Sequence, residues 1–87
     1  MPAYDEYPQF DGLSSSEMLR LIIEARLSRT DIQIAVSRLV WGMEYADIGA
    51  AVGMDRSAVS KRLHGQIVPR IEKIMERIDK GREGLPR

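Results

Sequence analysis

GMEYADIGAAVGMDRSAVSKRLHG, residues 42–65, carries the clearest structural pattern in this chain. Its apolar side chains recur at four-residue steps, Ile48 with Val52 and Val59 with Leu63. That spacing places both members of a pair on one face of a helix. The stretch therefore predicts two short helices that pack together through these faces.

The residues between the two helices are those of a tight turn. Gly53 is suited to end the first helix, because glycine adopts the left-handed backbone conformation without a Cβ penalty. Asp55 is suited to cap the second helix by accepting a hydrogen bond from the amide of Ser57 or Ala58. Gly49 is small where the two helices would cross, so their axes can approach closely.

The outward face of the second helix is polar and cationic. With Val59 and Leu63 facing inward, that face carries Arg56, Ser57, Ser60, Lys61 and His64. Arginine and lysine can donate to guanine O6 and N7 or to phosphates, and serine permits close approach to DNA. An ordinary solvated helix can carry the same charges. In register with the turn, however, the face predicts a helix-turn-helix that binds double-stranded DNA.

Residues 42–49 and 52–55 resemble the lambda-repressor-like (Cro/XRE-type) DNA-binding domains, and the resemblance extends over residues 31–79. Gly65 and Pro69 fall where that family often has a glycine after the recognition helix and a proline opening the next helix. The resemblance implies that the first helix of the pair meets a phosphate at Tyr45. It also implies base-reading or groove-facing positions for Arg56, Ser57, Ser60 and Lys61.

Three features depart from that family's pattern. Glu44 stands where serine or threonine usually caps the first helix of the pair, and Gly49 replaces the usual alanine. Arg62, Leu63 and His64 look more like the end of a sigma-factor region 4 or LuxR-type recognition helix. The candidate DNA contacts are therefore Tyr45, Asp55, Arg56, Ser57, Ser60, Lys61, Arg62 and His64, with Arg70 and Lys73 from the next helix.

Length and composition limit the alternatives. The 87 residues are enough for one small domain, and 44% apolar residues can build a small core that a second subunit could supplement. There is no cysteine, which fits the reducing cytoplasm, and no apolar run approaches the ~20 residues of a membrane span. The first ten residues do not read as a signal peptide. We expect a cytoplasmic protein without a membrane segment.

The net charge is zero, but it is unevenly distributed. Residues 1–19 carry four acidic and no basic residues, whereas residues 56–87 carry nine basic and four acidic ones, a net charge of +5. The chain thus has an acidic arm and a basic C-terminal part. Residues 1–13 read as an extended arm that is either mobile or docked through Tyr4, Tyr7 or Phe10. Its acidity argues against a minor-groove role.

Three further helices are expected around the central pair. The first covers residues 14–27 and opens with a capping box of Ser14 and Glu17. It is apolar enough to be buried on two sides, by this chain alone or with a partner subunit. The second covers residues 28–41, with a capping box of Thr30 and Gln33, and Trp41 as a core or interface anchor.

The last expected helix covers residues 68–80, after a break at residues 64–66. Its basic stripe, which includes Arg70 and Lys73, would lie beside the DNA backbone or pair with acidic residues on the same helix. Its apolar stripe of Ile71, Ile74, Met75 and Ile78 closes the core or forms a dimer seam. Residues 81–87 read as a frayed polar tail.

No residue pattern indicates catalysis or a cofactor. His64 is the only histidine and has no cysteine to join it in a metal site. The close acidic pairs, Asp5 with Glu6 and Glu72 with Glu76, lie in a loose arm and on a helix surface, where no pocket is implied. We therefore expect neither an enzyme nor a bound metal or cofactor.

The sequence predicts an all-α, five-helix domain over residues 14–80. The function it favours is a transcriptional regulator, a small phage or mobile-element repressor that binds an inverted repeat as a homodimer. The dimer would use the first helix (Met18, Leu19, Ile22, Ile23) or the last (Ile71, Met75, Ile78). One alternative is a DNA-packaging or recombination accessory factor. Another is an antitoxin-like or anti-sigma-like module that binds a protein partner through the acidic arm.

Overall fold

The computed structural model describes the backbone of residues 6–83 and the side chains of residues 6–78. Within this range the chain is all-helical and contains no strand, which confirms the expected all-α class. A 3-10 turn, η2 (Pro8–Phe10), precedes the helices α1 (Ser15–Glu24), α2 (Arg29–Ala35) with its π-helical extension η3 (Val36–Val40), α3 (Tyr45–Val52), and α4 (Arg56–Arg62), η4 (Leu63–Ile67) and α5 (Val68–Glu83). None of these helices has the length and apolar character needed to cross a bilayer.

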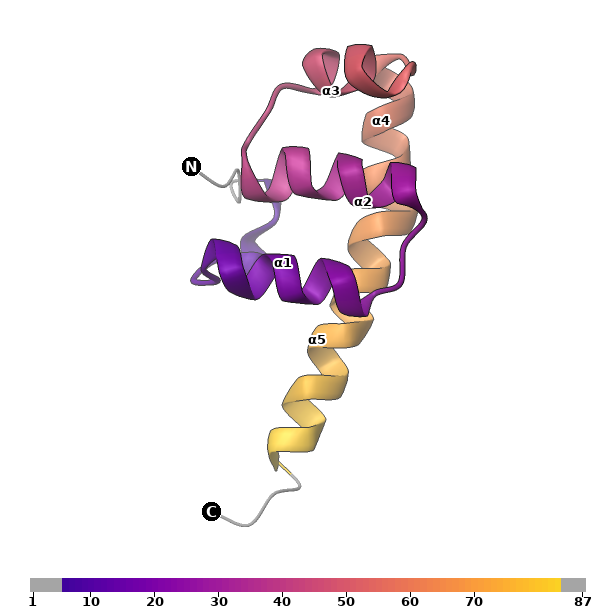
Figure 1. Cartoon of the computed structure of the whole chain (residues 1–87). Coiled ribbons are helices and arrows are strands. Elements are labelled where there is room, and N and C mark those ends of the chain that lie inside the picture. Colours follow the sequence, from indigo (N-terminus) through magenta and orange to yellow (C-terminus); the bar gives the residue numbers. More distant parts are fainter. Residues whose placement is uncertain (1–5, 84–87) are drawn as a thin grey trace.

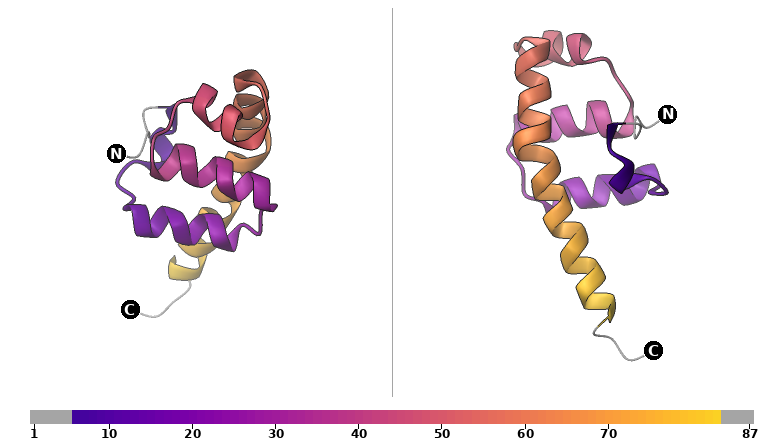
Figure 2. Two further views of the ribbon diagram at one scale, coloured as in Figure 1. Left: turned by 45° about the horizontal axis from the view of Figure 1, so that its top comes forward. Right: turned by 180° about the vertical axis from the view of Figure 1, so that it is seen from behind.

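One long helix organises the molecule. α4, η4 and α5 follow one another without a break, and α1 and α2 lie side by side across this long helix (Figure 1). α3 packs against α4 at one end, while α5 extends beyond α1 at the other (Figure 2). The described part of the chain therefore forms four helices in space, and the expected fifth is the continuation of α4.

The predicted helix break at residues 64–66 is wrong. Gly65 costs a helix only about 1 kcal/mol relative to alanine, which burial of the apolar residues on either side can offset. Leu63, Ile67 and Ile71 recur every four residues and are fully buried, so the inward face continues through the glycine. The π turn η4, in which the Val68 amide donates to the Leu63 carbonyl, also accommodates the missing amide of Pro69.

The helix starts are partly as predicted. Ser14 and Glu17 form the expected capping box, each side chain accepting from the other residue's amide at 3.1 Å. α1 then ends at Glu24 rather than at residue 27, because Arg26 adopts a left-handed conformation with φ of 52°. The predicted Thr30 and Gln33 box is not formed. Ser28 caps α2 instead, accepting from the Asp31 amide at 3.2 Å.

The N-terminal segment is docked on the body of the protein. Tyr7 and Phe10 are 2% and 0% exposed, and both belong to the one hydrophobic core. Of the two alternatives left open for the arm, docking is therefore observed for residues 6–13. Tyr4, Asp5 and the tail residues 84–87 lie outside the described residues. α5 reaches Glu83, three residues beyond its predicted end.

Some apolar residues expected in the core are exposed. Trp41 is 64% exposed, so of the two roles predicted for it the core anchor is wrong: η3 ends at Val40, and Trp41 is outside the buried face. On α1, Met18 and Ile22 are buried, whereas Leu19 and Ile23 are 37% and 68% exposed. Within this chain α1 is therefore covered on one side only.

Candidate nucleic-acid interface

The turn between α3 and α4 is built as the sequence predicts. Gly53 ends α3 with φ of 73°, and the Met54 amide donates to the Gly49 carbonyl at 2.9 Å. A Cβ atom added to Gly49 would lie 2.3 Å from the Met54 carbonyl oxygen, a distance that no side chain tolerates. Gly49 therefore lets the turn fold closely onto α3. Ile48 and Val59 are 1% and 0% exposed and join the two helices through the core.

The start of α4 differs from the prediction in one respect. Asp55 occupies the N-cap position with φ of −69° and ψ of 152°, but its side chain makes no capping hydrogen bond. The predicted bond to Ser57 or Ala58 is thus absent. The first turn of α4 keeps its amides free of a side-chain acceptor, and these amides carry the positive end of the helix dipole.

Five of the predicted contact residues line one shallow cleft. The beginning of α3 forms one wall and the outer face of α4 forms the other. Arg56, Ser57 and Lys61 are exposed, and Tyr45 and Ser60 are partly buried. Neither Arg56 nor Lys61 makes a hydrogen bond or ion pair with any of the residues that the structure describes. The lining residues are Glu44, Tyr45, Ala46, Arg56, Ser57, Ser60 and Lys61.

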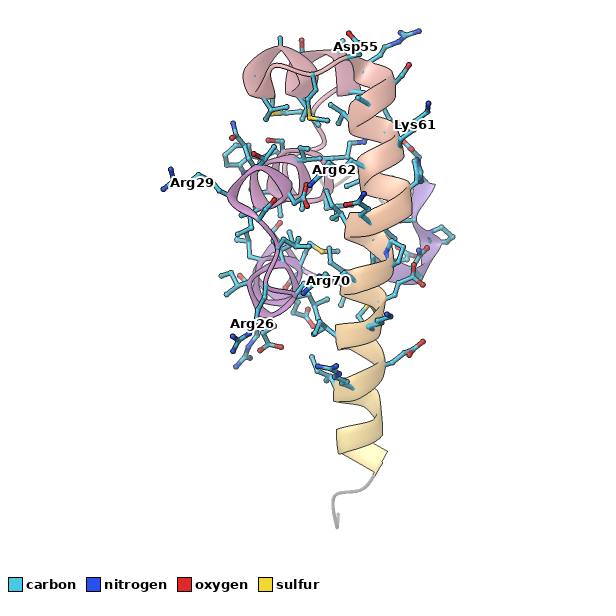
Figure 3. All side chains as sticks on the ribbon, turned by 90° about the vertical axis from the view of Figure 1, so that its right-hand side faces the viewer. Arg26, Arg29, Asp55, Lys61, Arg62 and Arg70 are labelled. Atoms are coloured by element: carbon cyan, nitrogen blue, oxygen red, sulfur yellow. The ribbon has the colours of Figure 1, made fainter. Side chains whose placement is uncertain are left out.

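Arg62 and Arg70 are used inside the molecule. Arg62 forms a two-pronged ion pair with the buried Asp31 of α2, and its Nη2–Oδ2 distance is 3.2 Å. The Nε atom of Arg70 donates to the carbonyl oxygen of Ala25 at the end of α1, at 2.7 Å. Both side chains point from the long helix toward α1 and α2, whereas Lys61 points away (Figure 3). Their predicted contacts with DNA would require these bonds to be shared or broken.

Lys73 lies far from the cleft. It lines a second depression between α5 and the end of α1, together with Arg26, Arg70 and Arg77. At 1.5 Å per residue, the axial distance along the long helix from Arg56 to Lys73 is about 25 Å. Lys73 is therefore not part of the α3–α4 cleft.

His64 belongs to a polar cluster beside the cleft. The Tyr45 hydroxyl donates to Glu6 Oε2 at 2.6 Å, and His64 Nε2 lies 3.7 Å from the same oxygen. The Tyr7 hydroxyl lies 3.3 Å from the Tyr45 hydroxyl and from both His64 ring nitrogens. The second Glu6 oxygen pairs with Arg38. The docked segment thus contacts two predicted DNA-binding residues.

The cluster shifts the ionisation of its members. The hydrogen bond from Tyr45 and the interaction with Arg38 lower the pKa of Glu6 below its ordinary value of 4.5. They outweigh partial burial of the carboxylate, which acts in the opposite direction. Burial, with the Glu6 hydrogen bond, raises the pKa of Tyr45. Burial, together with the hydrogen bond to Tyr45, raises the pKa of Tyr7. Glu6 is therefore a carboxylate and both tyrosines are neutral near pH 7.

Three residues that make these contacts, Glu6, Asp31 and Arg38, were not predicted from the sequence to contact the candidate DNA-binding residues. Arg38 and Glu6 are 32 positions apart, and Asp31 is 31 positions from Arg62. No local spacing links such pairs. The only signal was the aromatic content of residues 4–10, which suggested docking without indicating where.

No family model, curated protein or solved structure matches this chain in comparisons with known proteins. The described residues also contain no group of three or more histidine or acidic side chains placed to hold a metal ion.

Proposed function

We propose that this protein is a sequence-specific double-stranded DNA-binding regulator, with α3 and α4 acting as a helix-turn-helix. The observation that carries the proposal is the α3–α4 cleft. It gathers Tyr45, Arg56, Ser57, Ser60 and Lys61, all five of which the sequence predicts to contact DNA. A major groove about 12 Å wide admits a helix, and α4 would enter it with its first turn toward the bases.

The charges of the cleft suit this role. Arg56 and Lys61 are exposed and have no partner among the described residues, so they can donate to bases or phosphates without first breaking an internal bond. The free amides at the start of α4 add a positive partial charge at the same end. Ser57 and Ser60 are short and allow the helix to approach closely.

We further propose that the protein acts as a homodimer through α1. A single recognition helix buries too little surface for high specificity, and a two-fold dimer would read an inverted repeat with half-sites about one DNA turn apart. Of the residues expected at the seam, Met18, Ile22 and Ile71 are fully buried in the core. Leu19 and Ile23 are 37% and 68% exposed on α1, whereas on α5 Ile78 is 38% exposed, so α1 presents the larger exposed apolar surface and is favoured over α5. Sedimentation equilibrium of the parent and of Ile23→Ser should show a dimer only in the parent.

The test of DNA recognition is selection from a random duplex library followed by fluorescence anisotropy at two salt concentrations. The proposal expects one enriched sequence, bound more tightly than random duplex, with an affinity that falls steeply as salt rises. Double substitution of Arg56→Ala and Lys61→Ala should abolish the preference. A folded protein that enriches no sequence would contradict the proposal and favour a protein-binding role for the same fold.

A further inference from the structure

The cluster around Glu6 has the composition of an anion-binding pocket. The Glu6 carboxylate is held by the Arg38 guanidinium and by the Tyr45 hydroxyl at 2.6 Å, with His64 Nε2 at 3.7 Å. All three side chains come from outside the N-terminal segment. The pocket would therefore persist if the Glu6 side chain rotated away.

Arg38 is held in place by contacts other than Glu6. Its Nη1 donates to the Met43 carbonyl at 2.8 Å, and its guanidinium lies 4.4 Å from the centre of the Tyr45 ring. Its side chain is 12% exposed, and its buried Nε has no hydrogen-bond partner. A cation fixed by its own scaffold can bind an oxyanion at little further cost in conformational entropy.

The pocket adjoins the α3–α4 cleft. Tyr45 lines the cleft with its side chain and also donates to Glu6. His64 follows the cleft residue Ser60 by four positions on the same continuous helix, so both lie on one face. A DNA strand along the cleft would pass this pocket with its phosphates.

We infer that this pocket is a binding site for a DNA backbone phosphate, and that Glu6 occupies it in the DNA-free protein. The inference rests on the proposed function. Guanidinium, phenol and imidazole groups donate to phosphate oxygens as they do to a carboxylate. Glu6 is exposed over about a third of its side chain, and the buried Tyr7 and Phe10 anchor the segment behind it. The carboxylate can thus leave while the segment stays docked, and Glu6 competes with DNA.

The experiment compares Glu6→Gln with Asp11→Asn by fluorescence anisotropy on the selected duplex. Each change removes one negative charge from the N-terminal segment, but Asp11 is exposed and outside the pocket. We expect Glu6→Gln to tighten binding about tenfold, the equivalent of one charge-assisted contact, and Asp11→Asn to tighten it about twofold or less. Circular dichroism melting shows whether both variants remain folded.

A second comparison separates competition from a general charge effect. Tyr45→Phe removes the hydroxyl and keeps the ring beneath Arg38, so in that background the gain from Glu6→Gln should shrink to about threefold or less. Equal gains from Glu6→Gln and Asp11→Asn would overturn the inference while leaving the proposed function standing. Loss of binding in Glu6→Gln would also overturn it. If the parent protein binds no duplex, both proposals fail together.

Discussion

Two faces of the long helix carry similar charges and use them differently. Arg56 and Lys61, on the outer face of α4, have no partner in the part of the chain that the structure describes. Arg62 and Arg70, farther along the same helix, bind Asp31 of α2 and the carbonyl of Ala25 at the end of α1. The first pair is available for a ligand, whereas the second pair holds α1 and α2 against the helix.

The difference shows that a basic stripe read along one helix does not define a nucleic-acid surface. What separates the two pairs is the second element that each side chain meets. Arg62 and Arg70 point from the long helix toward α1 and α2, whereas Lys61, the residue next to Arg62, points away from them (Figure 3). If the two faces differ in function as their contacts imply, substitutions on them should differ in effect.

The largest effect is expected from Val59→Asp. Val59 is fully buried between α3 and α4, so an aspartate there would place an unpaired charge in the core. We expect a loss of more than about 4 kcal/mol in the free energy of unfolding, which would unfold a domain of this size.

Ser57→Asp, two residues away and exposed, is the matched control for Val59→Asp. It places an acid in the first turn of α4, where the helix dipole tolerates it, so the fold should remain intact while DNA binding is lost to charge repulsion. Thermal melting by circular dichroism separates the two variants. A folded Val59→Asp would mean that the core is misplaced.

A smaller effect is expected from Arg62→Ala. The substitution leaves the Asp31 carboxylate, whose side chain is 9% exposed, without its partner. Removing one member of a pair is destabilising because the remaining charge stays buried alone, and because the Arg62 side chain is 36% exposed we expect a smaller loss in the free energy of unfolding than for Val59→Asp. Chemical denaturation measures this loss.

Arg29→Ala provides the comparison for Arg62→Ala. Arg29 projects away from the long helix and makes no ion pair with any described residue (Figure 3). Its removal should change the free energy of unfolding by less than about 0.5 kcal/mol. Equal effects of the two substitutions would show that Arg62 does not hold α2 in place.

Substitution by alanine should change stability in opposite directions at Gly49 and at Gly65. Gly49→Ala forces a Cβ against the Met54 carbonyl and should destabilise the protein by about 1–3 kcal/mol. Gly65 lies inside the continuous helix with open space around its Cβ position, so Gly65→Ala should stabilise by about 0.4–1 kcal/mol. Destabilisation by Gly65→Ala would argue for a break in the helix at η4.

The smallest effect is expected on the pH dependence of stability, through the ionisation of Glu6. Because the folded-state pKa of Glu6 lies below its ordinary value of 4.5, its contribution to stability is present above that value and is lost as the pH falls through the lower folded-state value. Melting temperatures between about pH 6 and pH 3 should therefore fall less in Glu6→Gln than in the parent. Parallel curves would mean that the Glu6 cluster does not contribute to stability.

Local patterns predicted the helix pair well. The left-handed Gly53, the close approach at Gly49 and the burial of Ile48 and Val59 all follow from residues within one short stretch. The capping box of Ser14 followed in the same way. Each of these features depends on interactions between near neighbours, which sequence spacing reports directly.

Features that depend on tertiary contacts were missed. Gly65 and Pro69 indicated a helix boundary, yet burial of Leu63, Ile67 and Ile71 keeps the helix continuous. The partners of Arg62 and Arg70 come from α2 and the end of α1, and nothing near these residues in the sequence specifies them. The same holds for the docking of Glu6 against residues of α3 and η3.

A comparison of Arg56→Ala with Arg77→Ala tests whether α4 recognises DNA. Both residues are exposed cations on the same continuous helix, one at the α3–α4 cleft and one near the far end. The measurement is the ratio of affinities for the selected duplex and for random duplex at one salt concentration. We predict that Arg56→Ala lowers this ratio by the equivalent of about 1–3 kcal/mol, while Arg77→Ala leaves it unchanged. An unchanged ratio in Arg56→Ala, or a larger fall in Arg77→Ala, would contradict the assignment of DNA recognition to α4.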